Sequence, residues 1–310
     1  MTELTEWFEN IFFARHETFC PRYGWLKKGF DAVSQDPKVF DQPDAIETLG
    51  VGKNMIRAIR YWCMAFKIIE PIIEKRPLQI GGEMKVTDFG RLLFDEENGW
   101  DPFAEDIATL WLLHWQLFMP PVIATAWPLA INTNLSGEFT AKDLTLTILD
   151  RIEQNLKFKR YSSSSIEKDA SCFIGMYGLS KHKDAEEIEC PFTQLDILLP
   201  GNKKQNVLFN IDEKLSLPDE IFLAACLNYA ASTQSGLMSL SLNKIVYDFN
   251  SPGIVFRLSE TEAGRRLEES VKEIIGISFI ESYGNRQLLF EKNPEDLYFS
   301  VLEDYYTSNR

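Results

Sequence analysis

The sequence predicts a mainly α-helical protein with small β wings. Apolar residues recur at helical spacing between residues 53 and 69, a strongly helical stretch follows residue 101, and a strand–turn–strand pattern lies near the end of the chain. With 310 residues, 45% hydrophobic and 25% charged, the composition is that of a globular protein with ample material for a core. We therefore expect an N-terminal winged helix over residues 1–100, a helical linking region over 101–200 and a second winged-helix-like unit over 201–310.

The first unit is predicted to contain a helix-turn-helix. A helix around Tyr23–Val33 and a polar connection precede a short helix at Asp44–Leu49, a turn at Gly50–Gly52 and a longer third helix over Lys53–Ile69. The third helix is predicted from apolar residues that share one side: Met55, Ile56, Ile59, Trp62, Cys63 and Phe66. Its basic residues then project elsewhere. Lys85–Phe94 is expected to supply a strand and the short helix of a wing region.

The central region is predicted to be strongly helical. One helix is expected to open on Asp101–Pro102, an N-cap and first-turn pair, and another to run over Ala141–Phe158. The serine run Ser162–Ser165 then interrupts the pattern. It forms a flexible joint, a cap for a helix starting near Ile166, or a loop that contacts phosphate.

The last third is predicted to repeat the order of elements of the first. After an exposed polar loop at Ser180–Glu189, helices are expected at Asp219–Ala231, Leu242–Asn250 and Glu260–Glu273. A strand-like stretch with a Tyr-Gly-Asn turn at Tyr283–Asn285 follows. Three helices and a hairpin suggest the second winged helix.

The charge distribution sets one segment apart. A formal net charge of -14 and a pI near 4.8 argue against indiscriminate coating of nucleic acid, because phosphate contacts need cations. Val51–Ile69 nevertheless contains Lys53, Arg57, Arg60 and Lys67 and no acidic residue. A focused cationic face can still bind a polyanion, since a phosphate responds to the local potential. A solvated helix face, or one that meets an acidic protein partner, explains the same pattern.

Cysteine usage and hydropathy favour a cytoplasmic protein. The five cysteines are scattered without a C-x-x-C pair, so neither a disulfide framework nor a zinc knuckle is indicated. The acidic first ten residues lack the basic and apolar regions of a secretory signal. No uninterrupted apolar run is long enough to span a bilayer.

The candidate DNA-binding residues lie on the predicted third helix and on the first helix of the same unit with the loop before it. Side chains near the start of such a helix reach base edges or phosphates when the helix enters a groove. Those on the helix are Lys53, Asn54, Arg57 and Arg60. Phosphate contacts that fix the register are expected from Arg22, Lys27 and Lys28, unless these form a solvated face. Three aromatic residues stack on an unpaired base or, more ordinarily, pack in the core: Tyr23, Trp25 and Trp62.

His16 and Glu17 form the candidate catalytic pair. An imidazole beside a carboxylate that can bind metal suits a phosphodiester hydrolase, although adjacent residues converge on one phosphate only in an irregular turn. Cys20 is either a nucleophile or a buried structural thiol. We expect a divalent metal ion, Mg²⁺ or Mn²⁺, for such a reaction. No motif for nucleotide hydrolysis, dinucleotide binding, an esterase or a zinc protease occurs.

Four motifs follow one another along the chain. They are HETF-x-PRYGWLKKG at residues 16–29, VGKNMIRAIRYWC at 51–63, KD-x-x-CF-x-x-x-Y at 168–177 and CPFTQL at 190–195. In this order they resemble the SspB-like component of the SspABCD bacterial DNA phosphorothioation systems, over most of the chain and most specifically in its first 70 residues. The matching positions include His16, Glu17, Thr18, Phe19, Pro21, Arg22, Trp25, Lys27, Lys28, Gly52, Lys53, Asn54 and Arg57.

The resemblance implies a role in phage defence through modification of the DNA backbone. The implied partners are DNA, a cysteine desulfurase, an ATPase and an ATP-pyrophosphatase, which together replace a non-bridging phosphate oxygen by sulfur. The implied activity is nicking of one strand, which opens the backbone for sulfur incorporation. The alternatives are a non-catalytic DNA-binding scaffold for the sulfur-transfer enzymes and a winged-helix transcriptional regulator. Glu167 and Lys168 stand where the family leads us to expect more basic residues, so a catalytic role for Asp169 is in doubt.

Overall fold

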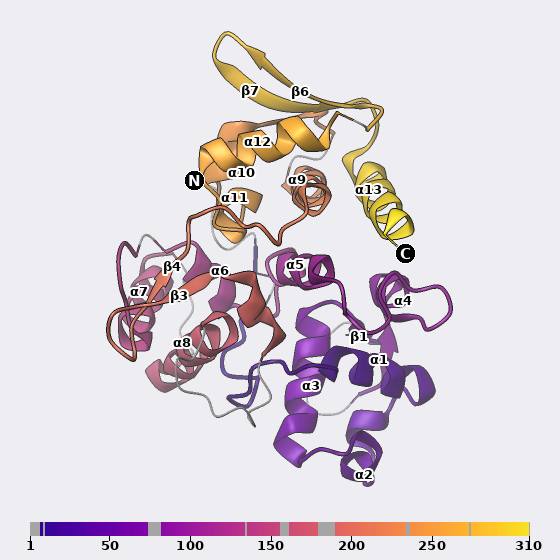
Figure 1. Ribbon diagram of the computed structural model, residues 1–310. Helices are drawn as coiled ribbons and strands as arrows, with labels where there is room; N and C mark the ends of the chain where they lie inside the picture. The colour runs from indigo at the N-terminus through magenta and orange to yellow at the C-terminus, as the bar shows by residue number, and fades with distance from the viewer. Residues whose placement is uncertain are drawn as a thin grey trace.

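The computed structural model describes residues 7, 8, 10–73, 82–133, 135–155, 161–178, 190–233, 236–272 and 274–309. Within them the chain is mainly α-helical with small antiparallel sheets, which confirms the predicted fold class at that level (Figure 1). None of the described helices is both long and apolar enough to cross a membrane.

The N-terminal elements follow the predicted order. They are α1 (Trp25–Gln35), the 3-10 turn η2 (Val39–Asp41), α2 (Ala45–Leu49), α3 (Lys53–Ala65), β1 (Ile69–Pro71), β2 (Met84–Val86) and α4 (Asp88–Phe94). Helix α3 is shorter than predicted, because Lys67 takes a left-handed φ of 59° that ends the helix and Ile69 already belongs to β1. Strand β1 pairs antiparallel with β2, and β2 and α4 form the strand and short helix expected there.

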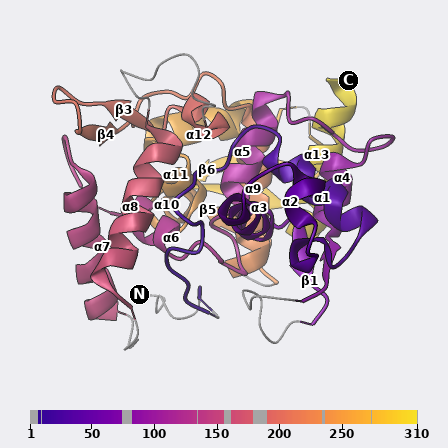
Figure 2. The same cartoon turned by 90° about the horizontal axis from the view of Figure 1, so that it is seen from below.

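Helices α1 and α3 pack closely because a glycine stands at their contact. A Cβ added to Gly29 of α1 would lie 2.3 Å from the Cys63 sulfur of α3. The face of α3 toward the core buries Ile59, Trp62 and Cys63 completely. Figure 2, which views the molecule from below, shows α1 and α2 beside α3. This packing leaves the opposite face of α3 at the surface.

The central elements form the middle of the molecule. They are α5 (Ile107–Gln116), α6 (Ala126–Ile131), α7 (Ala141–Asn155), α8 (Ser163–Tyr177), the 3-10 turn η3 (Pro191–Leu195), β3 (Leu198–Pro200) and β4 (Val207–Phe209). The prediction that a helix opens on Asp101 is wrong: α5 begins at Ile107, and its N-cap Asp106 accepts from the Ala108 amide at 2.9 Å. The Asp101 carboxylate instead accepts from the amides of Glu105 and Asp106, at 3.0 Å each, in the turn that precedes the helix.

The serine run caps a helix. Ser162 Oγ accepts a hydrogen bond from the Ser165 amide at 3.2 Å, and α8 begins at Ser163. The cap is therefore confirmed among the three alternatives, although the helix starts before Ile166. The predicted loop at Ser180–Glu189 and the end predicted near Phe158 for the preceding helix lie outside the described residues.

The C-terminal elements include the predicted helices and hairpin. They are α9 (Asp219–Thr233), β5 (Ser239–Ser241), α10 (Leu242–Tyr247), α11 (Pro252–Val255), α12 (Glu260–Ser270), β6 (Ile277–Ser282), β7 (Asn285–Phe290) and α13 (Pro294–Ser308). The hairpin turn carries positive φ at both Tyr283 (52°) and Gly284 (78°), which suits a tight turn between twisted strands. The sequence did not predict β5 or α13. Strand β5 joins the hairpin in the order β5-β7-β6.

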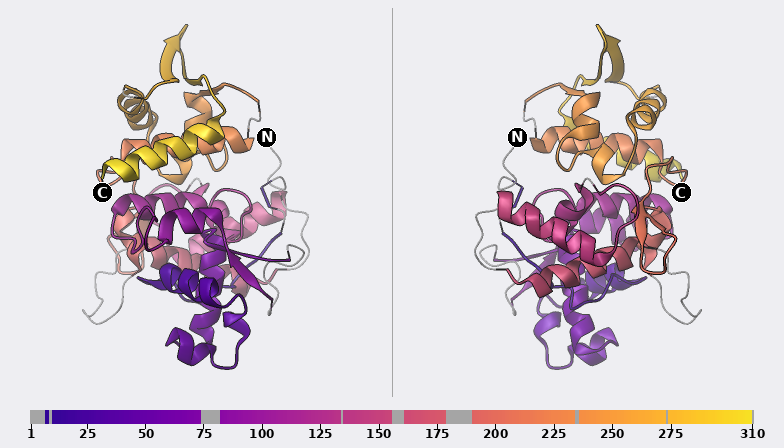
Figure 3. Two further views of the ribbon diagram at one scale, coloured as in Figure 1. Left: turned by 90° about the vertical axis from the view of Figure 1, so that its right-hand side faces the viewer. Right: turned by 90° about the vertical axis from the view of Figure 1, so that its left-hand side faces the viewer.

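The three predicted regions pack against one another. Helix α13 lies along α9, and Trp100 stacks on Tyr306 of α13 with ring centroids 5.2 Å apart. His114 of α5 contacts both the Tyr177 hydroxyl of α8 and the Val255 carbonyl of α11. Figures 1 and 3 show the β6–β7 hairpin and the α2–α3 region at opposite ends of the molecule. The division into units at residues 100 and 200 stays a prediction.

Candidate functional site

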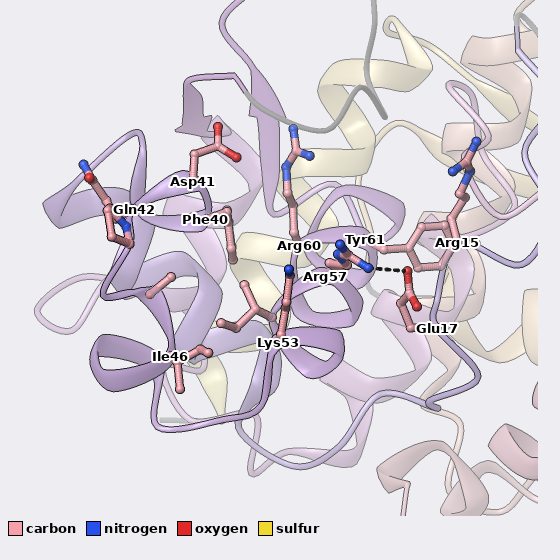
Figure 4. Close-up of a pocket in the computed structure, with 13 residues that line it drawn as sticks. Arg15, Glu17, Phe40, Asp41, Gln42, Ile46, Lys53, Arg57, Arg60 and Tyr61 are labelled. Carbon is pink, nitrogen blue, oxygen red and sulfur yellow. Dashed lines mark ion pairs between the residues drawn. The ribbon is translucent and has the colours of Figure 1, made fainter.

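A cavity of about 410 Å³ opens between α3, the segment Phe40–Ile46 and the loop Arg15–Glu17 (Figure 4). We refer to it as the α3 pocket. Its cationic lining consists of Arg15, Lys53, Arg57 and Arg60. Its carboxylates are Glu17 and Asp41, and its apolar lining includes Phe40, Pro43, Ile46 and Ile56. The pocket thus combines positive charge with accessible apolar surface.

Helix geometry places the three cations that α3 contributes. Lys53, Arg57 and Arg60 stand at positions i, i+4 and i+7, so they share one face of the helix. The roll of the helix is fixed by the buried residues on the other side. Lys53 and Arg57 are exposed, whereas Arg60 is half-buried, and burial lowers the pKa of its guanidinium. The start of α3 adds the positive end of the helix dipole near Lys53.

The loop opposite α3 is held by Asp169 of α8. The Ala14 amide donates to both carboxylate oxygens of Asp169 at 3.0 Å, and His16 Nε2 lies 2.8 Å from Oδ1. Ala14, Glu17 and Thr18 all have positive φ, between 51° and 66°. Such backbone conformations are uncommon outside glycine, so the anchoring contacts stabilise an otherwise unfavourable loop. The irregular turn that the pair would need is therefore present, but Glu17 lines the pocket and His16 does not.

His16 is completely buried. Its Nδ1 accepts from the Thr18 amide at 3.1 Å, which leaves Nε2 to donate to Asp169. Its ring also packs against Trp62, with centroids 6.1 Å apart. Burial raises the pKa of Asp169 above its usual value, while the hydrogen bonds from His16 and Ala14 oppose that rise. In this geometry His16 positions the loop and does not reach the pocket. A catalytic role for His16 stays a prediction, and its burial weighs against that role.

Glu17 is the accessible member of the predicted catalytic pair. Its carboxylate Oε1 lies 3.7 Å from Arg57 Nη1, and the two side chains are 33% and 44% exposed. An ion pair this long and this exposed is weak, since water screens it. Arg57 therefore keeps most of its capacity to bind an external anion.

The structure separates the remaining candidate residues from the α3 pocket. Lys27 is nearly buried and forms ion pairs with Asp31 at 2.5 Å and Glu96 at 3.1 Å. Although burial opposes the effect, hydrogen bonds to these two carboxylates raise the pKa of Lys27. Its charge is thus compensated inside the protein, which weighs against a phosphate contact.

Three further candidates also lie outside the pocket lining. Lys28 Nζ donates to the Leu49 carbonyl at 2.8 Å, at the end of α2. The Arg22 guanidinium lies over Trp25, 5.5 Å from the ring centroid. Asn54 is exposed on α3. Of the residues predicted from the sequence, the pocket brings together Glu17, Lys53, Arg57 and Arg60.

The sequence reasoning missed several pocket residues. Arg15 lies directly before His16, but its single charge gave no pattern. Phe40, Gln42 and Ile46 belong to a segment whose pattern predicts only a polar connection and a short helix. An aromatic residue next to Asp41 in that segment was the available signal. Of the aromatic residues considered for stacking, Trp25 and Trp62 are buried in the core, and Tyr23 is exposed but outside the pocket lining.

The described residues contain no group of three or more histidine, cysteine, aspartate or glutamate side chains placed to hold a metal ion. Glu17 and Asp41 are the carboxylates of the pocket lining, and Asp41 Oδ2 already accepts from the Gly82 amide at 2.6 Å. These residues do not fit a resident metal held by several protein ligands.

Comparison with known proteins covers nearly the whole chain. Residues 13–306 match the model of a family described as a protein of unknown function (DUF4007). A crystal structure of SspB aligns with a TM-score of 0.89 and 33% sequence identity over 96% of this chain and 88% of that one. A magnesium ion-bound SspB crystal structure aligns with the same score and identity over 98% and 90%.

No curated protein matches the chain in sequence. The full-length structural and sequence similarity nevertheless leads to one assignment. The chain belongs to the DUF4007 family and is an SspB-like protein.

Proposed function

We propose that this chain is the DNA-binding component of a DNA phosphorothioate modification system. The observation that carries the proposal is the α3 pocket, where Arg15, Lys53, Arg57 and Arg60 surround one cavity in a chain of net charge -14. Positive charge concentrated at one place suits a polyanion, because a phosphate responds to local potential. The place in a phosphorothioation system follows from membership of the SspB-like family.

The proposed mode of binding is that of a winged helix. In this proposal α2, the turn at Gly50–Gly52 and α3 form the helix-turn-helix, and the β1–β2 pair with α4 forms the wing. The cationic face of helix α3 would lie against the DNA. The loop that Asp169 anchors would bring Arg15 to a neighbouring phosphate. The elements α9 to β7 form the second winged-helix-like unit. The partners proposed within the system are the cysteine desulfurase, the ATPase and the ATP-pyrophosphatase.

The first test compares two arginines of equal exposure. Arg57 of the pocket is 44% exposed and Arg265 of α12 is 43% exposed, but Arg265 is ion-paired with Glu262 at 2.7 Å. Arg57→Ala should weaken binding of a labelled duplex by roughly tenfold and reduce the salt slope by about one, because one phosphate or base contact is lost. Fluorescence anisotropy across a salt series measures both quantities.

Arg265→Ala is the matched control and should leave both quantities unchanged. If the two variants bind alike, or if the native protein does not bind DNA at any salt concentration, the proposal is wrong.

Strand nicking is the second candidate function. It is favoured by the relative that was solved with magnesium, because phosphodiester cleavage commonly uses a divalent ion. The described residues place neither a cluster of metal ligands nor the His16 imidazole at the pocket surface. Incubation of supercoiled plasmid with the protein and MgCl₂, with and without EDTA, separates the two candidates. Relaxed circles that form only with the metal support nicking. Plasmid that is bound but stays supercoiled supports a DNA-binding component without nicking activity.

A further inference from the structure

The α3 pocket exposes apolar surface that binding of phosphate alone does not require. Phe40 projects from the 3-10 turn Val39–Asp41, whose other apolar residue, Val39, is buried. Ile46 of α2 is 50% exposed at the same cavity. Figure 4 shows Phe40 and Ile46 on the side of the pocket that faces Lys53. Phe40 is half-buried against the core and lines the pocket. An aromatic ring that lines a cationic groove is the arrangement with which proteins bind unpaired bases.

The size of the cavity also suits a ligand with a base. A volume of about 410 Å³ falls in the range in which proteins enclose small organic molecules, roughly 300–1,000 Å³. Phosphates on the outside of a duplex need only a cationic surface. A base that is paired and stacked inside a duplex presents its edges, and its flat face is accessible only after it leaves the stack.

The polar groups of the pocket divide into two sets. Lys53 and Arg57 on α3 supply the positive charge, while Asp41 and Gln42 line the opposite side, where the Gln42 amide points away from the α3 cations (Figure 4). Gln42 is held in place, since its Nε2 donates to Asp36 Oδ2 at 2.9 Å. A nucleotide has the same division, with an anionic phosphate at one end and a base with polar edges at the other.

We propose that the α3 pocket binds one unstacked nucleotide of the DNA, with its base on the Phe40 ring and its phosphate on Lys53 and Arg57. Ile46 and Ile56 line the cavity beside the base, and Asp41 lies on the side of its polar edge. The inference rests on the proposed DNA binding and adds the chemical form of the ligand. The nucleotide comes either from single-stranded DNA or from a base flipped out of a duplex.

The test uses two single-stranded probes with the same phosphates. One is a short labelled oligothymidine, and the other is a labelled deoxyribose-phosphate chain of the same length without bases. The native protein should bind the first about tenfold more tightly than the second, within the range measured for base stacking on an aromatic ring. Phe40→Ala should abolish this difference, whereas Arg57→Ala should weaken both probes by the same factor.

Two control variants separate stacking from folding. Phe40→Trp should restore the preference for the probe with bases, because an aromatic ring returns to the pocket. Phe299→Ala removes a phenylalanine that is 41% exposed on α13 and should change nothing. Circular dichroism melting of each variant verifies that it folds.

The source of the nucleotide is decided with duplexes that carry 2-aminopurine at successive positions. A rise in fluorescence on binding, lost in Phe40→Ala, identifies a flipped base. Duplexes without such a rise, together with a Phe40-dependent preference in the single-stranded probes, identify single-stranded DNA as the ligand. If Arg57→Ala weakens all probes but Phe40→Ala changes neither measurement, the nucleotide pocket is refuted while DNA binding stands. If no probe binds, both proposals are wrong.

Discussion

A buried pair of residues decides where the cationic loop stands. His16 is 0% exposed and Asp169 is 1% exposed, and they join the N-terminal loop to α8 across 153 positions of sequence. The loop residues Arg15 and Glu17 depend on this anchor for their place at the α3 pocket. The doubt about a catalytic role for Asp169 is consistent with this arrangement, because its carboxylate is fully engaged by the protein.

We expect Asp169→Ala to lower the free energy of unfolding by about 3 kcal/mol. The change leaves two donors without an acceptor, the buried His16 Nε2 and the partly buried Ala14 amide, and an unsatisfied buried group is unfavourable. Urea denaturation of Asp169→Ala, His16→Ala and the double variant forms a mutant cycle. The coupling energy should exceed about 1 kcal/mol, as for residues that share a buried hydrogen bond. Additive losses would contradict a direct role of the pair.

At the scale of elements, the contact between α1 and α3 sets how closely the two helices approach each other. A glycine at position 29 permits this contact, because a Cβ there would lie 2.3 Å from Cys63 Sγ and 3.2 Å from a methyl group of Ile59. Both helices are amphipathic, so periodicity predicts which face is buried. Periodicity does not predict how closely the two faces approach.

Gly29→Ala should destabilise the protein by roughly 1–3 kcal/mol, because overpacking forces the two helices apart. Cys63→Ala removes the sulfur atom that the new methyl group meets. Adding Gly29→Ala to the Cys63→Ala protein should therefore cost at most half of the free energy of unfolding that Gly29→Ala costs in the native protein. Chemical denaturation midpoints of the three variants measure this. A loss that Cys63→Ala does not relieve would show that another contact limits the approach.

At the scale of the whole molecule, His114 lies where three parts of the chain meet. Its Nε2 donates to the Val255 carbonyl of α11 at 2.9 Å, and its Nδ1 accepts from the Tyr177 hydroxyl of α8 at 2.8 Å. Both ring nitrogens are therefore engaged in the form of a neutral imidazole. Burial lowers the pKa of His114 from 6.5 to about 4, although the hydrogen bond to Val255 opposes this.

This pKa predicts that the molecule loses stability as the pH falls. Below pH 6.5 the unfolded chain binds a proton at His114 that the folded chain binds only near pH 4. The contribution of His114 to stability is thus complete above pH 6.5, and about 3 kcal/mol of it is lost by pH 4. Thermal melts between pH 7.5 and pH 4 measure the effect.

His114→Gln should be less stable than the native protein at pH 7.5 but should lose less stability on acidification. The acidic surface carboxylates act in both proteins, so the difference between the two curves isolates the histidine. Parallel curves would contradict the low pKa.

Much of the architecture follows from the sequence because it depends on local patterns. Helix α3 was predicted from apolar spacing and the β6–β7 turn from Tyr-Gly-Asn, and a helix cap was one of three alternatives for the serine run at Ser162. Elements shaped by distant partners were missed or misplaced. Strand β5 has only three residues and is defined by its pairing with β7, and α13 is held by α9 and Trp100.

The sequence by itself determined that the chain is mainly helical, that it is SspB-like, and that Lys53, Arg57 and Arg60 share a helix face. These properties depend on residue types and on spacing along one helix. Only the tertiary structure decided that His16 is buried against Asp169 and that the charge of Lys27 is compensated by Glu96. It also decided that Phe40 and Arg15 lie at the same pocket as the cations of α3. Burial, ion pairing and a common cavity each depend on residues that folding brings together from separate parts of the chain. A local sequence pattern does not indicate which distant residues become neighbours.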